Sequence, residues 1–392
     1  MLDSIYVGMT GLLGYSRGLR VIANNTANLN TPGFKSSSLQ FADLFYSRYG
    51  FGSGPGRDQV GFGVNTAGTS MSFTQGELRQ TGNDLDLAVD GQGLFVLQDE
   101  QGKTTYTRAG QFKFDTEGAL VSRINGEKVM AMDANGAFAP VSLTGKMINL
   151  GKPTSRVQFS GNLSNTVTEQ TAGGITVIDA GGTSHTLSLK FSVKSADASG
   201  TTMKVELMEG STVVSTSEMV FVDGKPTATT AVVQAGYTPS GQPAMALTLD
   251  FSSDVVLFAG QTSLKADSQD GVGPGAMSGA AFDATGTLVM TYSNGQTVKG
   301  PKLALARFDS PDAVGSVGDN QFEALNQNAW HVGVASEGAF GSVRSGRVEI
   351  SNVDLSQEFS DLVIMQRGYQ ASSQVISTAN DMLQELFSMK SR

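Results

Sequence analysis

Apolar residues recur at helical spacing at both ends of the chain. Near the C-terminus one row repeats every seven residues, as in the a/d seam of a coiled coil. Its members are Leu355, Leu362, Tyr369, Ile376 and Leu383, and Met365, Ala379 and Leu386 follow three residues after members of it. A second row, at intervals of three, four or seven, consists of Leu2, Ile5, Met9, Leu12, Leu19 and Ala23. One helix cannot bury such a row alone, so we expect the two rows to pair with each other or with copies of themselves.

The N-terminal row predicts a helix from residue 2 to about residue 29. Four glycines interrupt it, and each weakens an isolated helix by up to about 1 kcal/mol relative to alanine; they are Gly8, Gly11, Gly14 and Gly18. The glycines either let a neighbouring helix approach closely or are merely tolerated. The helix should end before Pro32-Gly33, because the residue before proline avoids the α region. Asp354 is the expected cap of the C-terminal helix.

Between the helices, alternating apolar and polar residues separated by glycine-containing turns predict antiparallel strands. One β domain is expected over 71–150 and again over 288–350. A segment rich in Thr, Ser, Val and Gly, 151–287, reads as an inserted outer β-sandwich or barrel. Residues 34–70 carry many aromatic residues but no sustained period and are expected to form an extended linker, which is either mobile or ordered by packing against another part of the chain. The fold class is therefore multi-domain and mainly β, with helical ends (1–33 plus 351–392) that form a coiled coil.

Composition narrows the choice of partners. A length of 392 residues favours two or three domains. The net charge of -9 comes without a basic run, which argues against nucleic acid and anionic membranes as partners. No apolar run approaches the roughly 20 residues that span a bilayer, and we expect no cleavable signal peptide. Cysteine is absent, which removes disulfides and thiolate chemistry and suits a chain exported unfolded or working outside the cell.

No residue cluster recommends an enzyme. Gly102-Lys103-Thr104 resembles the end of a phosphate-binding loop, but Leu97 stands where that motif needs glycine. Asp84, Asp86 and Asp90 suit solvated strand edges better than a Ca²⁺ site or an acid–base pair. The two histidines, His185 and His331, lie in different segments without a zinc or triad pattern. We therefore predict no catalytic, cofactor or metal site.

The specific signal is a self-assembly surface on the terminal helices. The predicted assembly residues are Leu2, Ile5, Met9, Leu12, Leu19, Leu355, Leu362, Tyr369, Ile376 and Leu383. The alternative is a helical hairpin that packs back on its own β domain. A secreted β-sandwich binding or adhesive module, tethered by its helices, also remains open from the residues alone.

Motifs at both ends resemble those of the bacterial flagellar rod and hook axial proteins. The N-terminal motif runs from Ile22 through Asn24-Asn25-Thr26-Ala27-Asn28 to Lys35, and the C-terminal one joins Ser351-Asn352-Val353-Asp354-Leu355 to Met365-Gln366-Arg367-Gly368-Tyr369-Gln370. Internal echoes are 82–89, 106–112 and 292–295. The 151–287 insert favours the hook members, which carry a large outer domain, while Thr31-Pro32-Gly33-Phe34 leans toward the rod members.

The resemblance implies a structural subunit of the flagellar hook, a flexible tubular joint that transmits torque from rod to filament. It implies a helical homopolymer, contacts with other axial proteins at the rod and filament ends, and passage through the flagellar export apparatus. It also implies an extracellular location reached without a cleaved signal peptide. A basal-body rod protein is the alternative within the family.

Overall fold

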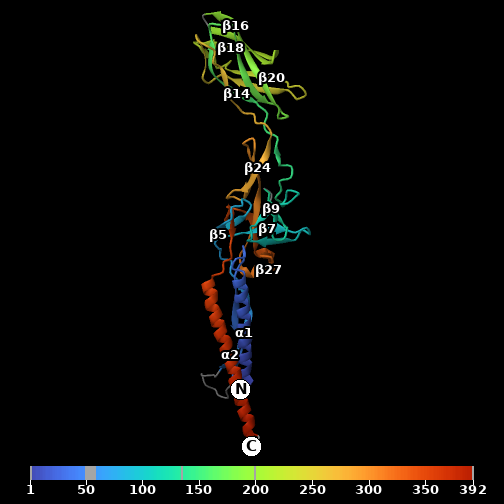
Figure 1. Cartoon of the computed structure of the whole chain (residues 1–392), viewed down its shortest axis with the longest axis vertical. Helices are drawn as coiled ribbons and strands as arrows, with labels where there is room; N and C mark the ends of the chain where they lie inside the picture. The colour runs from blue at the N-terminus through green and yellow to red at the C-terminus, as the bar shows by residue number, and fades with distance from the viewer. Residues whose placement is uncertain (1, 49–58, 134–135, 198–199, 391–392) are drawn as a thin grey trace. The chain divides into compact units, whose positions relative to one another are not determined.

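The computed structural model describes residues 2–48, 59–133, 136–197 and 200–390 (Figure 1). The described chain is mainly β with one long helix near each end, α1 (Leu2–Ala27) and α2 (Leu355–Lys390), so the predicted fold class is confirmed. It divides into two compact units. The first comprises Met1–Thr144, Ala280–Val289 and Lys299–Arg392; the second comprises Gly145–Gly279 and Met290–Val298.

Both helices begin and end close to where the sequence predicts. α1 ends at Ala27, a few residues before Pro32-Gly33, and the left-handed φ of +74° at Gly33 turns the chain there. At α2, the Asp354 carboxylate accepts hydrogen bonds from the backbone N–H groups of Ser356 (2.8 Å) and Gln357 (3.3 Å). Asp354 is therefore the N-cap, as predicted.

The β part of the first unit is built from short strands around a mostly antiparallel sheet. In this sheet β7 lies between β8 and β11, β28 extends it beyond β8, and β26 pairs with β7, β11 and β29. Besides β1–β4, described below, the strands of this unit before the second unit are β5 (Leu78–Gln80), β6 (Leu87–Asp90), β7 (Leu94–Gln98), β8 (Thr104–Thr107), β9 (Phe112–Phe114), β10 (Leu120–Ser122), β11 (Lys128–Met132) and β12 (Phe138–Pro140). Those after it are β26 (Thr297–Phe308), β27 (Val314–Gly318), β28 (Gln321–Ala324), β29 (Trp330–Val334), β30 (Ser342–Ser345) and β31 (Arg347–Glu349).

The segment expected to be a linker without strand period contains paired strands. β1 (Ser37–Asp43) pairs antiparallel with β4 (Val64–Met71), and β2 (Tyr46–Arg48) pairs with β3 (Gln59–Gly61). The sequence shows no sustained strand period here because the alternation of Leu39 and Phe41 with polar residues is short, and a register shift after Gln40 interrupts the ladder. Residues 49–58 lie outside the described chain. The β1/β4 ribbon contacts α1.

The second unit is a β-sandwich, one of the two folds that the sequence suggested. One sheet has the order β20-β21-β14-β22 with β23 on β14, and the other has the order β15-β16-β17-β18-β19. Their strands are β14 (Arg156–Ser164), β15 (Glu169–Ile178), β16 (Ser184–Asp197), β17 (Gly200–Glu209), β18 (Thr212–Val222), β19 (Lys225–Pro226), β20 (Val232–Tyr237), β21 (Met245–Asp250), β22 (Val255–Phe258) and β23 (Lys265–Gln269). A single apolar core joins the facing sides, with Phe159 stacked on Phe251 at 4.6 Å between ring centroids.

Three further strands lie in the sequence close to the boundaries between the two units: β13 (Ile148–Asn149), β24 (Gly275–Phe282) and β25 (Thr287–Tyr292). The turn around Tyr292 and Asn294 belongs to the second unit, although the sequence analysis placed it in the first β domain. The Tyr292 hydroxyl donates to the carbonyl of Lys146 (2.8 Å), and the Asn294 amide donates to that of Gly273 (2.8 Å). These hydrogen bonds tie the turn to the second unit.

Candidate functional site

The two terminal helices lie side by side in antiparallel directions (Figure 1). Gly8 of α1 faces Ser372 and Ile376 of α2, whereas Gly18 faces Met365. Moving forward along α1 therefore means moving backward along α2. The two helices therefore pair within one chain, and Ile376 of the C-terminal row faces Gly8 of α1.

Glycines lie where the two helices approach each other closely. A Cβ added at Gly8 would lie 2.8 Å from Ile376 Cγ1, and one at Gly11 would lie 2.6 Å from Ser372 Oγ. From the other helix, a Cβ at Gly368 would lie 2.5 Å from the Tyr15 ring. All three distances are shorter than ordinary contacts, so these glycines permit the close approach of the helices rather than being merely tolerated. Gly14 instead faces the β1/β4 ribbon.

The predicted assembly residues divide into two groups. Those half-buried in the unit are Ile5, Leu12, Leu19, Leu362, Ile376 and Leu383. Those exposed are Met9 at 58%, Tyr369 at 42% and Leu355 at 37%; the side chain of Leu2 lies outside the described part. The C-terminal row is therefore only partly covered in the single chain, with exposed Tyr369 between half-buried Leu362 and Ile376.

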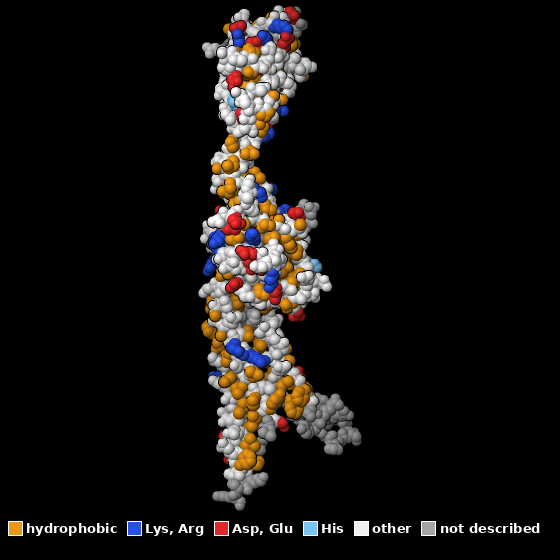
Figure 2. Space-filling model, turned by 90° about the vertical axis from the view of Figure 1, so that its right-hand side faces the viewer, with side chains coloured by type: hydrophobic (Ala, Val, Ile, Leu, Met, Phe, Trp, Pro, Cys, Tyr) orange, Lys and Arg blue, Asp and Glu red, His pale blue; other side chains and the backbone are white. Residues whose placement is uncertain are grey.

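Much apolar surface on the helix pair has no cover in the single chain. On α1, Tyr6, Met9 and Leu13 follow helical spacing and are 47%, 58% and 53% exposed. On α2, Ile364 and Val375 are 61% and 46% exposed. Figure 2 shows apolar side chains gathered along the helical part of the molecule. Clustered exposed apolar surface of this kind marks a protein–protein contact.

A buried ion cluster lies where both helices join the β part of the first unit. Glu349, the last residue of β31, contacts Lys35 Nζ with Oε1 (2.5 Å) and Arg108 with Oε2 (3.0 Å). All three side chains are at most 6% exposed. The remaining donors are also satisfied: Lys35 donates to the Thr74 carbonyl (2.8 Å), and Arg108 donates to the Val89 and Gly91 carbonyls. The cluster links the segment after α1 to the segment before α2.

Burying these three charges destabilises the folded chain unless all of them are present to compensate one another. Burial lowers the pKa of Lys35 and that of Arg108, and the Glu349 carboxylate opposes both shifts. Two cations share one anion in a site without water access. Removing the anion would leave two uncompensated buried charges.

Two asparagines from the terminal motifs clamp the helix ends to neighbouring backbone. The Asn25 amide donates to the Ser37 carbonyl (2.8 Å) and to Glu358 Oε1 of α2 (2.8 Å), and its oxygen accepts from Ser37 N–H. Asn352 accepts from Ser36 N–H (2.8 Å) and donates to the Ser72 carbonyl (2.8 Å). These hydrogen bonds tie both helix ends to the segments that follow α1 and precede α2.

Sequence reasoning missed this junction as a site. Lys35 and Arg108 stand in quoted motifs, but only the fold brings them to Glu349, 314 and 241 residues away. A usable signal was present in the sequence. Glu349 lies between Val348 and Ile350, and a charge inside an apolar strand indicates a buried partner.

The acidic residues, the two histidines and the Gly102-Lys103-Thr104 turn each have structural roles. Asp86 pairs with Arg123 (3.5 Å) and Asp90 with Arg344 (3.0 Å). His185 contacts Asp179 (2.9 Å), and His331 contacts Asp309 (2.8 Å). Gly102 and Lys103 form a hairpin turn closed on Asp99. Among the described residues, no group of His, Asp and Glu is arranged to hold a metal ion.

The helices of the described chain can be compared with what a membrane span requires. None of them is both long and apolar enough to cross a bilayer.

A mainly β body with paired, incompletely covered terminal helices fits a structural subunit better than an enzyme. Family models agree with this class. A flagellar basal body rod model matches residues 5–35, the flagellar hook protein FlgE/F/G D1 domain matches 88–181, and the C-terminal model of the basal body rod FlgEFG proteins matches 344–389. Each covers one of the motif regions named from the sequence.

Whole-chain relatives specify the family. The flagellar hook protein FlgE of Escherichia coli K12 is 30% identical over 97% of this chain and 98% of its own, and that of Borreliella burgdorferi B31 is 30% identical over all of both chains. A Helicobacter pylori FlgE2 crystal structure matches 69% of this chain and 100% of its own, with TM-score 0.47 and 12% identity. The chain belongs to the flagellar hook protein family. It is a structural hook subunit, and the rod and adhesin alternatives are not favoured.

Proposed function

We propose that the chain builds the hook by polymerising through its terminal helix pair into a helical tube. The carrying observation is the apolar surface of α1 and α2, which remains uncovered in the single chain. Copies that shared this surface would remove it from water, at about 25 cal/mol per Å² of apolar area. In the tube, the helical parts (1–33 plus 351–392) form the inner layer and 34–70 connect them to the body.

The same proposal assigns the remaining parts to outer layers. Residues 71–150 with 288–350 form the middle layer, and 151–287 form the outer surface. The Ser-, Thr- and Gly-rich composition of the outer part supports sliding between neighbours when the tube bends, because it offers few large apolar contacts to break.

Partners and route to the assembly site follow from family membership. We propose contacts with other axial proteins at the rod and filament ends and passage through the flagellar export apparatus, without a cleaved signal peptide. The absence of cysteine supports this route, since the chain needs no oxidative folding after export.

Electron microscopy of the concentrated, purified protein tests the function. The expected result is short curved tubes from the full chain and no polymer from a variant lacking 355–390. Straight rods would support a rod subunit. A full chain that stays monomeric at high concentration, and behaves like the truncated one, would contradict assembly and favour a tethered binding module.

A further inference from the structure

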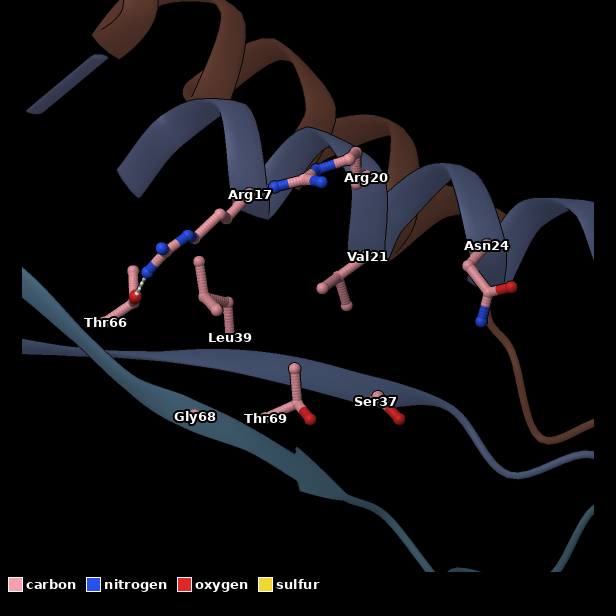
Figure 3. A pocket seen from close by; sticks show the side chains of 9 residues that line it. All are labelled: Arg17, Arg20, Val21, Asn24, Ser37, Leu39, Thr66, Gly68 and Thr69. Carbon is pink, nitrogen blue, oxygen red and sulfur yellow. Dashed lines mark hydrogen bonds between the residues drawn. The ribbon is translucent and has the colours of Figure 1, made fainter. Parts of the chain in front are cut away.

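A cavity of about 560 Å³ lies between α1 and the β1/β4 ribbon. Arg17, Arg20 and Val21 line it from the helix, while Leu39 and Thr69 line it from the ribbon. Figure 3 shows Val21 and Leu39 in the space between the helix and the strands, with Arg17 reaching Thr66. The cavity is open to solvent on one side. We call it the arginine groove.

The arginine groove is positive and lacks a negative partner in its own chain. Arg17 and Arg20 are the only basic residues of α1, and no acidic residue is among those that line the groove. Arg17 donates a hydrogen bond to the Thr66 hydroxyl. Within the described residues neither arginine forms an ion pair. Two like charges three residues apart on a helix repel each other.

The end of α2 has the opposite charge and also lacks a partner. Asp381 and Glu385 lie four residues apart, are exposed, and form no ion pair within the described chain. Two like charges at this spacing on a helix repel each other. Met382 and Leu386 beside them are 47% and 49% exposed.

Helix register shows that the end of α2 cannot be covered by its own α1. Because Gly8 faces Ile376 and the helices are antiparallel, α2 passes the start of α1 near Met382. The following residues, up to Lys390, extend beyond α1. They span roughly 12 Å at 1.5 Å per residue.

We propose that the arginine groove binds the C-terminal part of α2 from a second copy of this chain. Asp381 pairs with Arg20 and Glu385 with Arg17, while Met382 and Leu386 cover Val21 and Leu39. This interface rests on the proposed polymerisation and names the segment that each copy presents to the next.

The two ion pairs require the same displacement between copies. Within one chain, the antiparallel register places Asp381 near residue 3 of α1, so reaching Arg20 requires a shift of about 17 residues. Glu385 requires about 18 residues to reach Arg17. Both correspond to a stagger of roughly 26 Å along the helix axis. One rigid arrangement therefore satisfies both pairs.

Disulfide trapping tests the interface directly, because the chain has no cysteine of its own. Val21→Cys and Met382→Cys variants are mixed, polymerised, oxidised and separated on a denaturing gel. The expected product is a covalent dimer from the mixture. Val21→Cys mixed with Gln366→Cys, an exposed α2 position outside the proposed contact, should give none. The proposed interface would be refuted if the variants polymerise like the wild type but no Val21–Met382 dimer forms. It would also be refuted if the control pair forms as much dimer as the test pair. Neither result would contradict polymerisation itself.

Charge reversal gives an independent readout. Arg17→Glu with Arg20→Glu, and Asp381→Lys with Glu385→Lys, should each raise the critical concentration for polymerisation at least tenfold. The combined variant should recover most of that loss, and circular dichroism should show all three folded. Reversals without effect, or a combined variant without recovery, would refute the pairing. Failure of the wild-type chain to polymerise would instead refute the proposed function.

Discussion

Replacing Ile364 and Val375 with aspartate is expected to abolish polymerisation without unfolding the monomer. Both side chains are exposed in the single chain, at 61% and 46%, so the fold loses little. In the polymer, each should bury apolar area worth about 1.5–3 kcal/mol. A combined loss of about 3 kcal/mol or more raises the critical concentration at least ~100-fold.

The matched control is Gln366→Asp with Gln374→Asp. It adds the same two charges to exposed positions of the same helix and should polymerise nearly as the wild type does. Sedimentation measures the critical concentration, and thermal unfolding checks the monomer. Leu362→Asp should also block assembly, but Leu362 is half-buried, so that change disturbs the helix pair itself. Normal polymerisation of the Ile364/Val375 variant would show that this face is not a subunit contact.

Glu349→Gln is expected to lower the free energy of unfolding by about 3–5 kcal/mol, the usual cost of removing one member of a buried ion pair. The neutral side chain has nearly the same shape, so packing is kept while Lys35 and Arg108 lose their anion. Urea unfolding of the monomer measures the change. Glu100→Gln, at an exposed site, is the control and should change stability by less than about 0.5 kcal/mol.

The loss caused by Glu349→Gln should shrink as the pH rises toward 10. Burial already lowers the pKa of Lys35 below its ordinary 10.5, and losing the carboxylate lowers it further. Between the folded and unfolded pKa values, the unfolded chain binds more protons, so stability rises with pH. In the variant the folded pKa of Lys35 is lower, so its stability begins to rise at a lower pH than that of the wild type, and the difference between the two shrinks. A loss below about 1 kcal/mol, or one independent of pH, would show that the cluster does not hold the junction.

Helical periodicity predicted both terminal helices and the cap at Asp354, and it left open whether the two apolar rows pair within one chain or between copies. It did not predict which members of the rows meet. Close contacts between the helices fall on small residues such as Gly8, Gly11 and Gly368. A search for large apolar side chains passes over such positions.

The β1/β4 ribbon and the buried ion cluster could not be predicted from the sequence for another physical reason. Both depend on contacts between residues far apart in the chain, such as Lys35 with Glu349. Local alternation and spacing carry no record of such pairings. The terminal motifs did contain Lys35, Asn25 and Asn352, so their presence was visible in the sequence while their roles were not.

The central claim is that neighbouring copies cover the exposed apolar surface of the terminal helices. Amide hydrogen exchange on dilute monomer and on assembled tubes tests it most directly. Because much of their apolar surface is exposed in the single chain, the helices should exchange faster in the monomer than in the tube over residues 5–22 and 362–383, and become strongly protected on assembly. Strong protection of both segments already in the dilute monomer, unchanged on assembly, would contradict the claim.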